Sequence, residues 1–481
     1  MNQPNARSRD GNSSTPARRA RPAVEGLEER LLLYATLGAN WVYGSRITYS
    51  FVPDGTSVGG TPSVLYQSMN ARFWESTWQV AFQRAAAIWQ AVANINLVQV
   101  SDNGMAFGEY GNQQGDSRVG DIRIGAIPMG SGTLGAAFAP PQINGGTLAG
   151  DIVLNSTTPW MINANYDLQT VAIHEFGHAL GMDHSAIYNA VMYSYYVGMK
   201  QSLNSDDVGG IQSIYSARPY DAWNSNGQSN GVYWNTKSLD GWRNGLNQIT
   251  VPNLNITTSG QNEWFWVTIP ANNTGSFTVQ MQSSGLSSLS PQVYVYDSSL
   301  NLKGTAAAYG FGDTATITIP GVSSGQGFFI RLSASSGGGA GTGAFGMQVN
   351  FGSNPLTPFS PPYTVVASRA GTGGGFVAMT ANAGEEPDDD LLRIGTLTAK
   401  GDALSVWPSA DPTATVRAFA TPAPAPGLRA TLNDRQDVSA SWRYGLWTSI
   451  GFLDEALSAW GLGGDDDSPA FGKRAKAQKP A

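Results

Sequence analysis

Residues 174–184 read HEFGHALGMDH, and this stretch contains all three histidines of the 481-residue chain. His174 and His178 are four residues apart, so on a helix both imidazoles project from one face and can bind the same metal ion. Glu175 follows the first histidine, where its carboxylate can reach a water on the metal and accept its proton. The spacing therefore predicts a helix that carries a zinc site with an adjacent general base.

The residues after the second histidine predict how this site is completed. Gly181 lets the chain leave the helix with a positive φ and brings His184 back as the third ligand. Three protein ligands leave the fourth position of zinc open for water, which is typical of catalytic rather than structural sites. The alternative is a helix with two histidines facing a polar neighbour and a third in a loop. The glycine and the third histidine make a chance match much rarer than for a bare His-Glu-x-x-His.

A methionine downstream of the third histidine indicates the family. Met192 lies in residues 189–193 (NAVMY), where metzincins place a methionine turn under the metal. Together with residues 168–173 (LQTVAI) and 203–215 (LNSDDVGGIQSIY), the zinc motif resembles the matrixin (matrix metalloproteinase) branch of the metzincins. The resemblance implies one catalytic zinc, a methionine supporting the site, and endopeptidase activity.

The resemblance extends upstream to the segments that would build the catalytic domain. Residues 47–51 (ITYSF) resemble the first matrixin strand, and residues 78–89 resemble the first helix, with apolar residues at helical spacing. Residues 120–124 read as an inner strand, and residues 133–140 (TLGAAFAP) resemble the edge strand of the matrixin substrate cleft. We therefore expect an α+β metzincin domain at residues 41–217, with a twisted mixed sheet, an antiparallel edge strand and three helices.

The expected edge strand indicates the kind of substrate. It centres on Leu134, Gly135, Ala136 and Ala137. An edge strand offers unpaired N–H and C=O groups, so an extended peptide can bind there by adding a strand. The predicted substrate is therefore a protein or peptide.

Some positions depart from the matrixin pattern or leave a role open. Matrixins usually hold a second, structural zinc with a histidine near the position of Ala136, and this chain has no histidine left for it. Asp151 stands where the family places a calcium-associated loop, and it is either a calcium ligand or a solvated turn carboxylate. Asp206 and Asp207 have two alternative roles. They brace the methionine turn or the mature N-terminus, or they cap a helix.

Composition narrows the class of protein. Charged residues make up 13% of the chain, against a typical ~25%, and hydrophobic residues make up 41%, which is enough for packed cores. The net charge of −7 disfavours nucleic acid as a partner. Without cysteine, the chain has no disulfides and lacks the usual cysteine latch of a matrixin pro-segment. These features agree with a bacterial protein that is secreted, extracellular or at the cell surface.

Residues 1–40 are expected to form a disordered or export-related segment. Residues 24–35 (VEGLEERLLLYA) resemble the Leu-Glu-Pro-Arg-x-Leu-Leu motif near the start of many exported proteins of some bacteria, with Glu29 in place of proline. Their apolar run is too short to span a membrane, so no transmembrane span is expected. Two interpretations stay open: an export role, or a short amphipathic helix packed on the catalytic domain.

Beyond residue 217 the pattern becomes β-like. Residues 218–260 read as a linker or strand extension, and residues 261–352 contain short β-like runs that predict an antiparallel sandwich of seven or eight strands. Residues 285–297 (GLSSLSPQVYVYD) and 327–332 (GFFIRL) resemble the bacterial pre-peptidase C-terminal domain. That resemblance implies secretion, targeting or adhesion to a cell surface or matrix; a passive spacer is the alternative.

Residues 353–481 read as a low-complexity linker and a largely disordered tail, rich in Pro, Gly, Ala and Thr. Within the tail, residues 442–460 place apolar side chains at helical spacing, which predicts an amphipathic surface helix able to dock on a partner or membrane surface.

These features together predict an extracellular zinc endopeptidase that uses a zinc-activated water, with Glu175 as general base. The rival hypothesis is a surface adhesion or scaffold protein whose metalloprotease domain is inactive or processes only its own tail. The intact Glu175 favours the enzyme.

Overall fold

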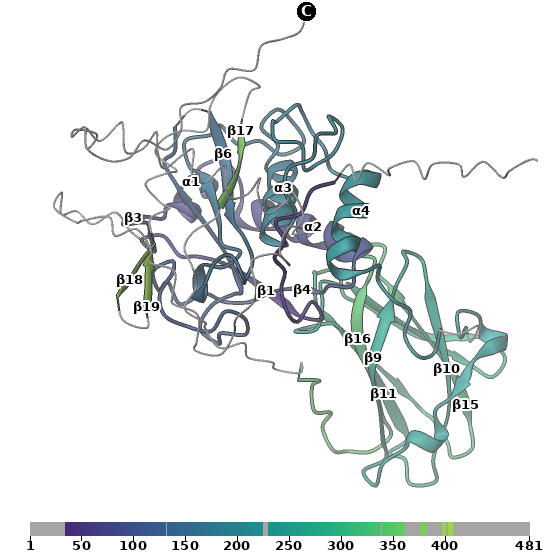
Figure 1. The fold of residues 1–481 in the computed structure, drawn as a ribbon. Helices are drawn as coiled ribbons and strands as arrows, with labels where there is room; N and C mark the ends of the chain where they lie inside the picture. The colour runs from purple at the N-terminus through teal and green to yellow at the C-terminus, as the bar shows by residue number, and fades with distance from the viewer. Residues whose placement is uncertain are drawn as a thin grey trace, which may run out of the picture. The chain divides into compact units, whose positions relative to one another are not determined.

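The computed structural model describes residues 34–130, 132–224, 229–337, 339–360, 376–380, 397–400 and 403–406. A sheet with helices is built from the described residues up to 217 together with residues 376–380, and we call this unit the first domain (Figure 1). Strands of two further sheets follow from residue 237 and form the unit we call the sandwich. The predicted helix at residues 442–460 lies outside the described residues.

The first domain is built on a six-stranded mixed sheet with the strand order β17-β6-β7-β5-β1-β4. Its strands are β1 (Ile47–Phe51), β4 (Leu97–Gln99), β5 (Ile122–Ile127), β6 (Thr133–Phe138), β7 (Ile152–Asn155) and β17 (Phe376–Thr380). Strands β4, β1, β5 and β7 run parallel to one another, whereas β6 runs antiparallel to β7. This mixed sheet confirms the predicted α+β class.

Strand β6 is antiparallel to its neighbour as expected, but it is not the outermost strand of the sheet. Strand β17 pairs antiparallel with β6 from Phe376 opposite Phe138 to Thr380 opposite Thr133, with a register shift after Met379 (Figure 1). The physical reason is that an unpaired strand edge readily accepts another strand. Here a distant segment of the same chain supplies that strand.

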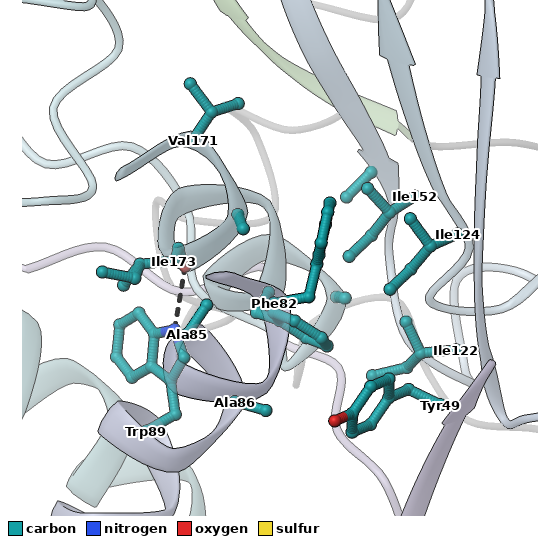
Figure 2. Close-up of a cluster of buried hydrophobic side chains, with 14 of the residues drawn as sticks. Tyr49, Phe82, Ala85, Ala86, Trp89, Ile122, Ile124, Ile152, Val171 and Ile173 are labelled. Carbon is teal, nitrogen blue, oxygen red and sulfur yellow. Dashed lines mark hydrogen bonds between the residues drawn. The ribbon is translucent and has the colours of Figure 1, made fainter. Parts of the chain in front are cut away.

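Four α-helices belong to the first domain, one more than the sequence predicts. They are α1 (Leu65–Asn70), α2 (Glu75–Val92), α3 (Leu168–Ala179) and α4 (Ser205–Tyr215). Figure 2 shows Phe82 of α2 directed toward Ile124 and Ile152 of the sheet, within the main hydrophobic core. Trp89 of α2 donates a hydrogen bond of 2.8 Å from Nε1 to the carbonyl of Ile173, which ties α2 to α3.

Several short elements complete the described chain. They are β2 (Ser57–Val58), β3 (Thr61–Pro62), β18 (Leu397–Lys400), β19 (Ala403–Val406), and the 3-10 turns η1 (Gly146–Leu148), η2 (Tyr233–Asn235) and η3 (Asp240–Trp242). Strands β2 and β3 pair antiparallel, as do β18 and β19. None of the helices in these ranges combines the length and the apolarity that crossing a membrane requires.

The sandwich consists of two sheets that share one hydrophobic core. One sheet has the order β13-β12-β15-β10-β8, and the other has the order β14-β11-β16-β9. The strands are β8 (Lys237–Ser238), β9 (Gln248–Ile256), β10 (Asn262–Thr268), β11 (Ser276–Gln282), β12 (Pro291–Asp297), β13 (Leu302–Ala307), β14 (Thr314–Pro320), β15 (Gly327–Ala334) and β16 (Gly343–Asn350). Burial alternates along β10 and β12, as expected when one face of each strand meets the core.

The sandwich follows one of the two alternatives predicted for residues 218–260 and departs from the predicted antiparallel pairing in one place. Strands β8 and β9 lie within residues 218–260, so this stretch extends the sheets instead of serving only as a linker. The pairing of β8 with β10 is parallel, whereas all other pairings in the two sheets are antiparallel. The all-β architecture predicted for this region is confirmed.

Buried polar side chains connect the first domain to the sandwich. Gln90 of α2 donates from Nε2 to the carbonyl of Thr342 (2.7 Å) and accepts from the amide of Ser288 (3.1 Å). The Arg218 guanidinium donates to the Gln90 carbonyl (2.8 Å) and to Oδ1 of Asn255 (2.8 Å). Burial lowers the pKa of Arg218 to about 10, so the group stays charged at neutral pH and needs these acceptors.

Candidate metal centre

Helix α3 carries two of the three histidines into the interior of the first domain. Every residue of the helix is buried, because α3 packs against α2 on one side and against β6 and β7 on another. Its first turn is capped by Asp167, whose side chain accepts a hydrogen bond from the amide of Thr170. The cap fixes where the helix starts and therefore which face His174 and His178 occupy.

Gly181 ends the helix in the way the sequence predicts. Its φ is 102°, and an added Cβ would lie 2.2 Å from the carbonyl oxygen of Ala39. The amide of Met182 bonds back to the carbonyl of Gly177 at 2.9 Å, which closes the last turn. Only glycine combines this conformation with so close a neighbour, and the turn returns the chain toward His184.

The three imidazoles converge on one point. Ligand nitrogens of His174, His178 and His184 all lie within 4.8 Å of one another, and the two Nε2 atoms on the helix are 2.9 Å apart. The Nδ1 atoms of His174 and His178 face the carbonyls of Val191 (2.8 Å) and Met182 (2.9 Å). If each Nδ1–H donates to its carbonyl, the tautomer leaves Nε2 free to bind a metal.

The protonation of these histidines also suits a metal. Burial, reinforced by the positive charge that His184 would carry, lowers the pKa of His174 to about 3. Burial and the two neighbouring histidines lower the pKa of His178 well below its usual value. Both rings are therefore neutral at pH 7, which is the form that binds zinc. Two neutral imidazoles on α3, with a ligand nitrogen of His184 converging on the same point, fit a zinc ion.

Glu175 lies fully buried between α3 and β6. A Cβ added to Gly135 would stand 2.9 Å from Oε1 of Glu175, so the carboxylate rests against the backbone of β6. Among the described residues neither oxygen has a hydrogen bond of good geometry. Burial raises the pKa of this carboxyl well above its usual value, and the nearby backbone amide of Met379 partly opposes that shift through a weaker contact. The group is thus a buried acid–base candidate beside the three histidines.

Met192 lies under the helix that carries two of the histidines. An added Cβ on Gly177 would lie 2.3 Å from the Met192 sulfur, so the thioether packs directly on the helix backbone. The carboxylate of Asp207 accepts hydrogen bonds from the amides of Val191 (2.9 Å) and Met192 (3.1 Å) and thereby holds the turn.

The two aspartates at the start of α4 have separate partners. Asp207 also completes a capping box with Asn204, so bracing and capping, which the sequence left as alternatives, occur together. Asp206 accepts a hydrogen bond of 2.5 Å from the hydroxyl of Ser185, one residue after the third histidine.

Sequence reasoning missed Lys200. Its Nζ donates to the carbonyls of Tyr188 and Ala190, both at 2.6 Å, and lies 5.2 Å from the centre of the Tyr193 ring. The lysine thus supports the loop between His184 and Met192. No local pattern marks a lysine for this role, because its acceptors are backbone carbonyls.

The expectation that Asp151 is a solvated turn carboxylate is wrong. Its side chain is 0% exposed and accepts a hydrogen bond from the amide of Arg123 at 2.9 Å. Burial raises the pKa of its carboxyl well above the usual value, although the Arg123 charge opposes this. Within the described ranges, the three histidines are the group of three or more such side chains whose ligand atoms converge as a metal site requires, and Asp151 is not part of that group.

The predicted cleft residues, Leu134, Gly135, Ala136 and Ala137, all belong to β6. Residues 135–137 pair with β7 on one side, and the same residues pair with Val377, Ala378 and Met379 of β17 on the other. The structure therefore brings together the three histidines, Glu175, Met192 and this strand.

The fold and the three-histidine cluster together define a matrixin domain. Residues 61–216 match the family model described as Matrixin. This range contains β6, α3, all three histidines and Met192. The resemblance found in the sequence is thereby confirmed for the first domain, whereas the type of the sandwich stays a prediction.

The chain is similar to karilysin, to a plant metalloendoproteinase and to a human matrix metalloproteinase. Karilysin of Tannerella forsythia is 33% identical over 141 residues, which cover 28% of this chain and 28% of karilysin. Metalloendoproteinase 2-MMP of Arabidopsis thaliana is 30% identical over 206 residues, which cover 38% of this chain and 50% of that protein. Matrix metalloproteinase-27 of Homo sapiens is 44% identical over 147 residues, 29% of this chain and 26% of that protein. The chain therefore spans half or less of the length of these relatives.

Proposed function

We propose that the matrixin domain is a zinc-dependent endopeptidase that hydrolyses peptide bonds in proteins. One observation carries this proposal: three imidazoles converge beside a buried carboxylate, next to a strand that accepts an extended chain. A structural metal site would need neither Glu175 nor the peptide-binding strand. The arrangement is that of a site built to act on a polypeptide.

In this proposal each residue has a defined task. His174, His178 and His184 hold the zinc, which when bound acts as a Lewis acid and lowers the pKa of a water. Glu175 accepts a proton from that water and then donates it to the amine that leaves. Burial raises the pKa of Glu175, which helps the carboxyl to keep the proton between the two steps.

Strand β6 supplies the means to hold a protein substrate. Its backbone groups on the side away from β7 pair with an extended segment. Main-chain hydrogen bonds give affinity without fixing the sequence, whereas side-chain pockets give selectivity. The proposed substrate is therefore a protein or peptide that binds in extended form.

We also propose that the enzyme acts outside the cell or at its surface, with the sandwich as the part that attaches it there. The support is the low charge content, the absence of cysteine and the resemblance of residues 285–297 to a domain of secreted peptidases. Fractionation of the source cells tests the location. Recovery in the medium or the surface fraction supports it, and recovery in the cytoplasm alone contradicts it.

Hydrolysis of casein or gelatin by purified full-length protein tests the activity. The Glu175→Ala variant should lose about 10²–10⁴-fold in rate, because it lacks the general acid–base group. Glu109→Ala is the matched control, since Glu109 is an exposed glutamate of the same domain. Zinc content should be equal in all three proteins. Zinc-loaded wild type that cleaves neither substrate would favour the adhesion or scaffold hypothesis.

A further inference from the structure

Strand β17 occupies the position that an extended substrate would take. It runs antiparallel to β6 (Figure 1) and also contacts α3, the helix that carries two of the three histidines. Its residues lie 243 to 247 positions beyond Thr133 in the sequence. The pairing is therefore a long-range contact, which needs a reason other than chain proximity.

The segment is also held on its second edge. The amide of Thr380 donates to the carbonyl of Ser194 (3.2 Å), and the carbonyl of Thr380 accepts from the amide of Tyr196 (2.9 Å). Thr380 thus forms a parallel bridge with Tyr195, while the rest of the strand runs antiparallel to β6. A chain held from both sides in extended form is how a peptide is presented for cleavage.

The register places one peptide bond at the proposed reacting groups. Met379 stands opposite Gly135, and Gly135 is the residue against which the Glu175 carboxylate rests. The Met379 side chain is 1% exposed and joins the hydrophobic core that also contains Leu134 and Tyr196. Thr380 commits its own amide to Ser194, whereas the amide of Met379 is the backbone donor near the Glu175 carboxyl.

We propose that residues 376–380 are an internal substrate of this site and that the chain cleaves itself between Ala378 and Met379. This inference rests on the proposed function. Water adds its oxygen to the carbonyl carbon of Ala378, and the C–N bond to Met379 breaks. Glu175 takes one proton from the water and passes it to the departing amine of Met379. The products are a chain ending at Ala378 and a fragment beginning at Met379.

A consequence for other substrates follows from the same geometry. Strand β17 uses the hydrogen-bonding groups of β6 that an external peptide would need. The cleft is therefore closed to other proteins until residues 376–380 are cut and leave. Casein hydrolysis should show a lag that ends as the tail is released.

The first test is the intact mass and N-terminal sequence of full-length protein incubated with zinc. Wild type should yield a new N-terminus at Met379, and Glu175→Ala should stay whole. Met379→Asp places a charge in a buried position and should reduce the cut at least 10-fold, whereas Met379→Leu keeps the volume and should preserve it. A cut at another bond, or a cut unaffected by Met379→Asp, overturns the inference.

A second readout does not depend on activity. The amide of Phe138 donates on the β7 side, and successive amides of a strand alternate between its two neighbours, so in the uncut Glu175→Ala protein the amides of Gly135 and Ala137 should exchange slowly with solvent because β17 covers them. Adding Met379→Asp should speed their exchange at least 10-fold, and adding Met379→Leu should not. Equal exchange in the three proteins overturns the placement of the strand.

The two proposals fail in different ways. Wild type that hydrolyses casein without a lag while residues 376–380 stay intact overturns the internal substrate and leaves the endopeptidase standing. Zinc-loaded wild type that cleaves neither casein nor its own tail overturns both.

Discussion

The sheet of the first domain and the sheets of the sandwich use their strands in opposite ways. All six residues of β5 are buried, because other strands flank β5, the main hydrophobic core covers one of its faces, and a smaller cluster that includes Val58 and Phe107 covers the other. In β10 the burial alternates residue by residue, with Phe265 inside and Trp264 and Trp266 partly open to solvent. Strand β5 of the first sheet thus has no residue exposed to solvent, whereas every second residue of β10 in the sandwich is partly exposed.

This difference has a consequence for function. Glu175, His174 and His178 lie in an environment where their pKa values are shifted by burial, so their chemistry depends on packing. The outer positions of the sandwich are open to solvent and carry no comparable cluster among the described residues. The first domain should therefore respond sharply to small changes near the site, and the sandwich should respond only at inward positions.

Removal of zinc should produce the largest difference in stability between the first domain and the sandwich. A chelator should abolish casein hydrolysis and lower the free energy of unfolding of the first domain, by about 4 kcal/mol if free zinc had stood ~1,000-fold above Kd. The sandwich should unfold as before, since every histidine lies in residues 174–184. Scanning calorimetry with and without chelator measures this. A shift of both transitions would contradict the separation.

A core deletion tests the inward face of the sandwich. Met347 of β16 is 0% exposed, so Met347→Ala should lower the free energy of unfolding by about 2–5 kcal/mol. Thr316→Ala is the outward control and should change it by no more than about 0.5 kcal/mol. Urea denaturation gives both values. Equal effects would show that the alternation does not decide stability.

One added methyl group tests how tightly the metal site is packed. Gly177→Ala places a Cβ 2.3 Å from the Met192 sulfur and 2.9 Å from the Trp89 ring. Overpacking of this kind costs about 1–3 kcal/mol, and here it should weaken zinc binding as well. Gly245→Ala is the control, since an added Cβ there meets nothing within 4 Å. Thermal unfolding and zinc titration compare the stability and the zinc affinity of the two variants. Equal stability and equal zinc affinity would contradict the packing argument.

The smallest effect concerns a buried carboxyl of the sandwich. Burial, with the nearby Asp221 charge, raises the pKa of Glu263 well above its usual value. The unfolded chain releases this proton near pH 4.5 and the folded chain at higher pH, so stability falls as pH rises above 4.5. Glu263→Gln imitates the protonated form and should stabilise the protein by about 1 kcal/mol at pH 8.

Urea denaturation at pH 5 and pH 8 checks the sign of this effect. The gain from Glu263→Gln should be present at pH 8 and much smaller at pH 5. A gain at pH 5 that disappears at pH 8 would contradict the assignment of the raised pKa.

Local sequence patterns were enough to predict the periodic helices and strands and the metal-binding motif. The helix with two histidines, the glycine with positive φ and the alternating strands β10, β11 and β12 could all be predicted. Each is decided by neighbours within a few residues, through helical or strand periodicity.

The missed elements depend on distant partners. Strand β13 (Leu302–Ala307) has no fully buried residue, so its sequence shows no alternation of buried and exposed positions. Strand β9 contains Pro252 and Asn253, and its pairing is irregular there because Asn253 has a φ of 58°. Strand β17 is five residues long and pairs with a strand more than two hundred positions away. No local pattern within residues 376–380 predicts that contact.

Metal analysis of purified full-length protein tests the central claim most directly. We predict one zinc ion per wild-type chain, and none in His178→Ala protein that keeps its fold by circular dichroism. A wild-type chain without stoichiometric zinc, or a His178→Ala chain that keeps its zinc, would contradict the metal centre and the chemistry built on it.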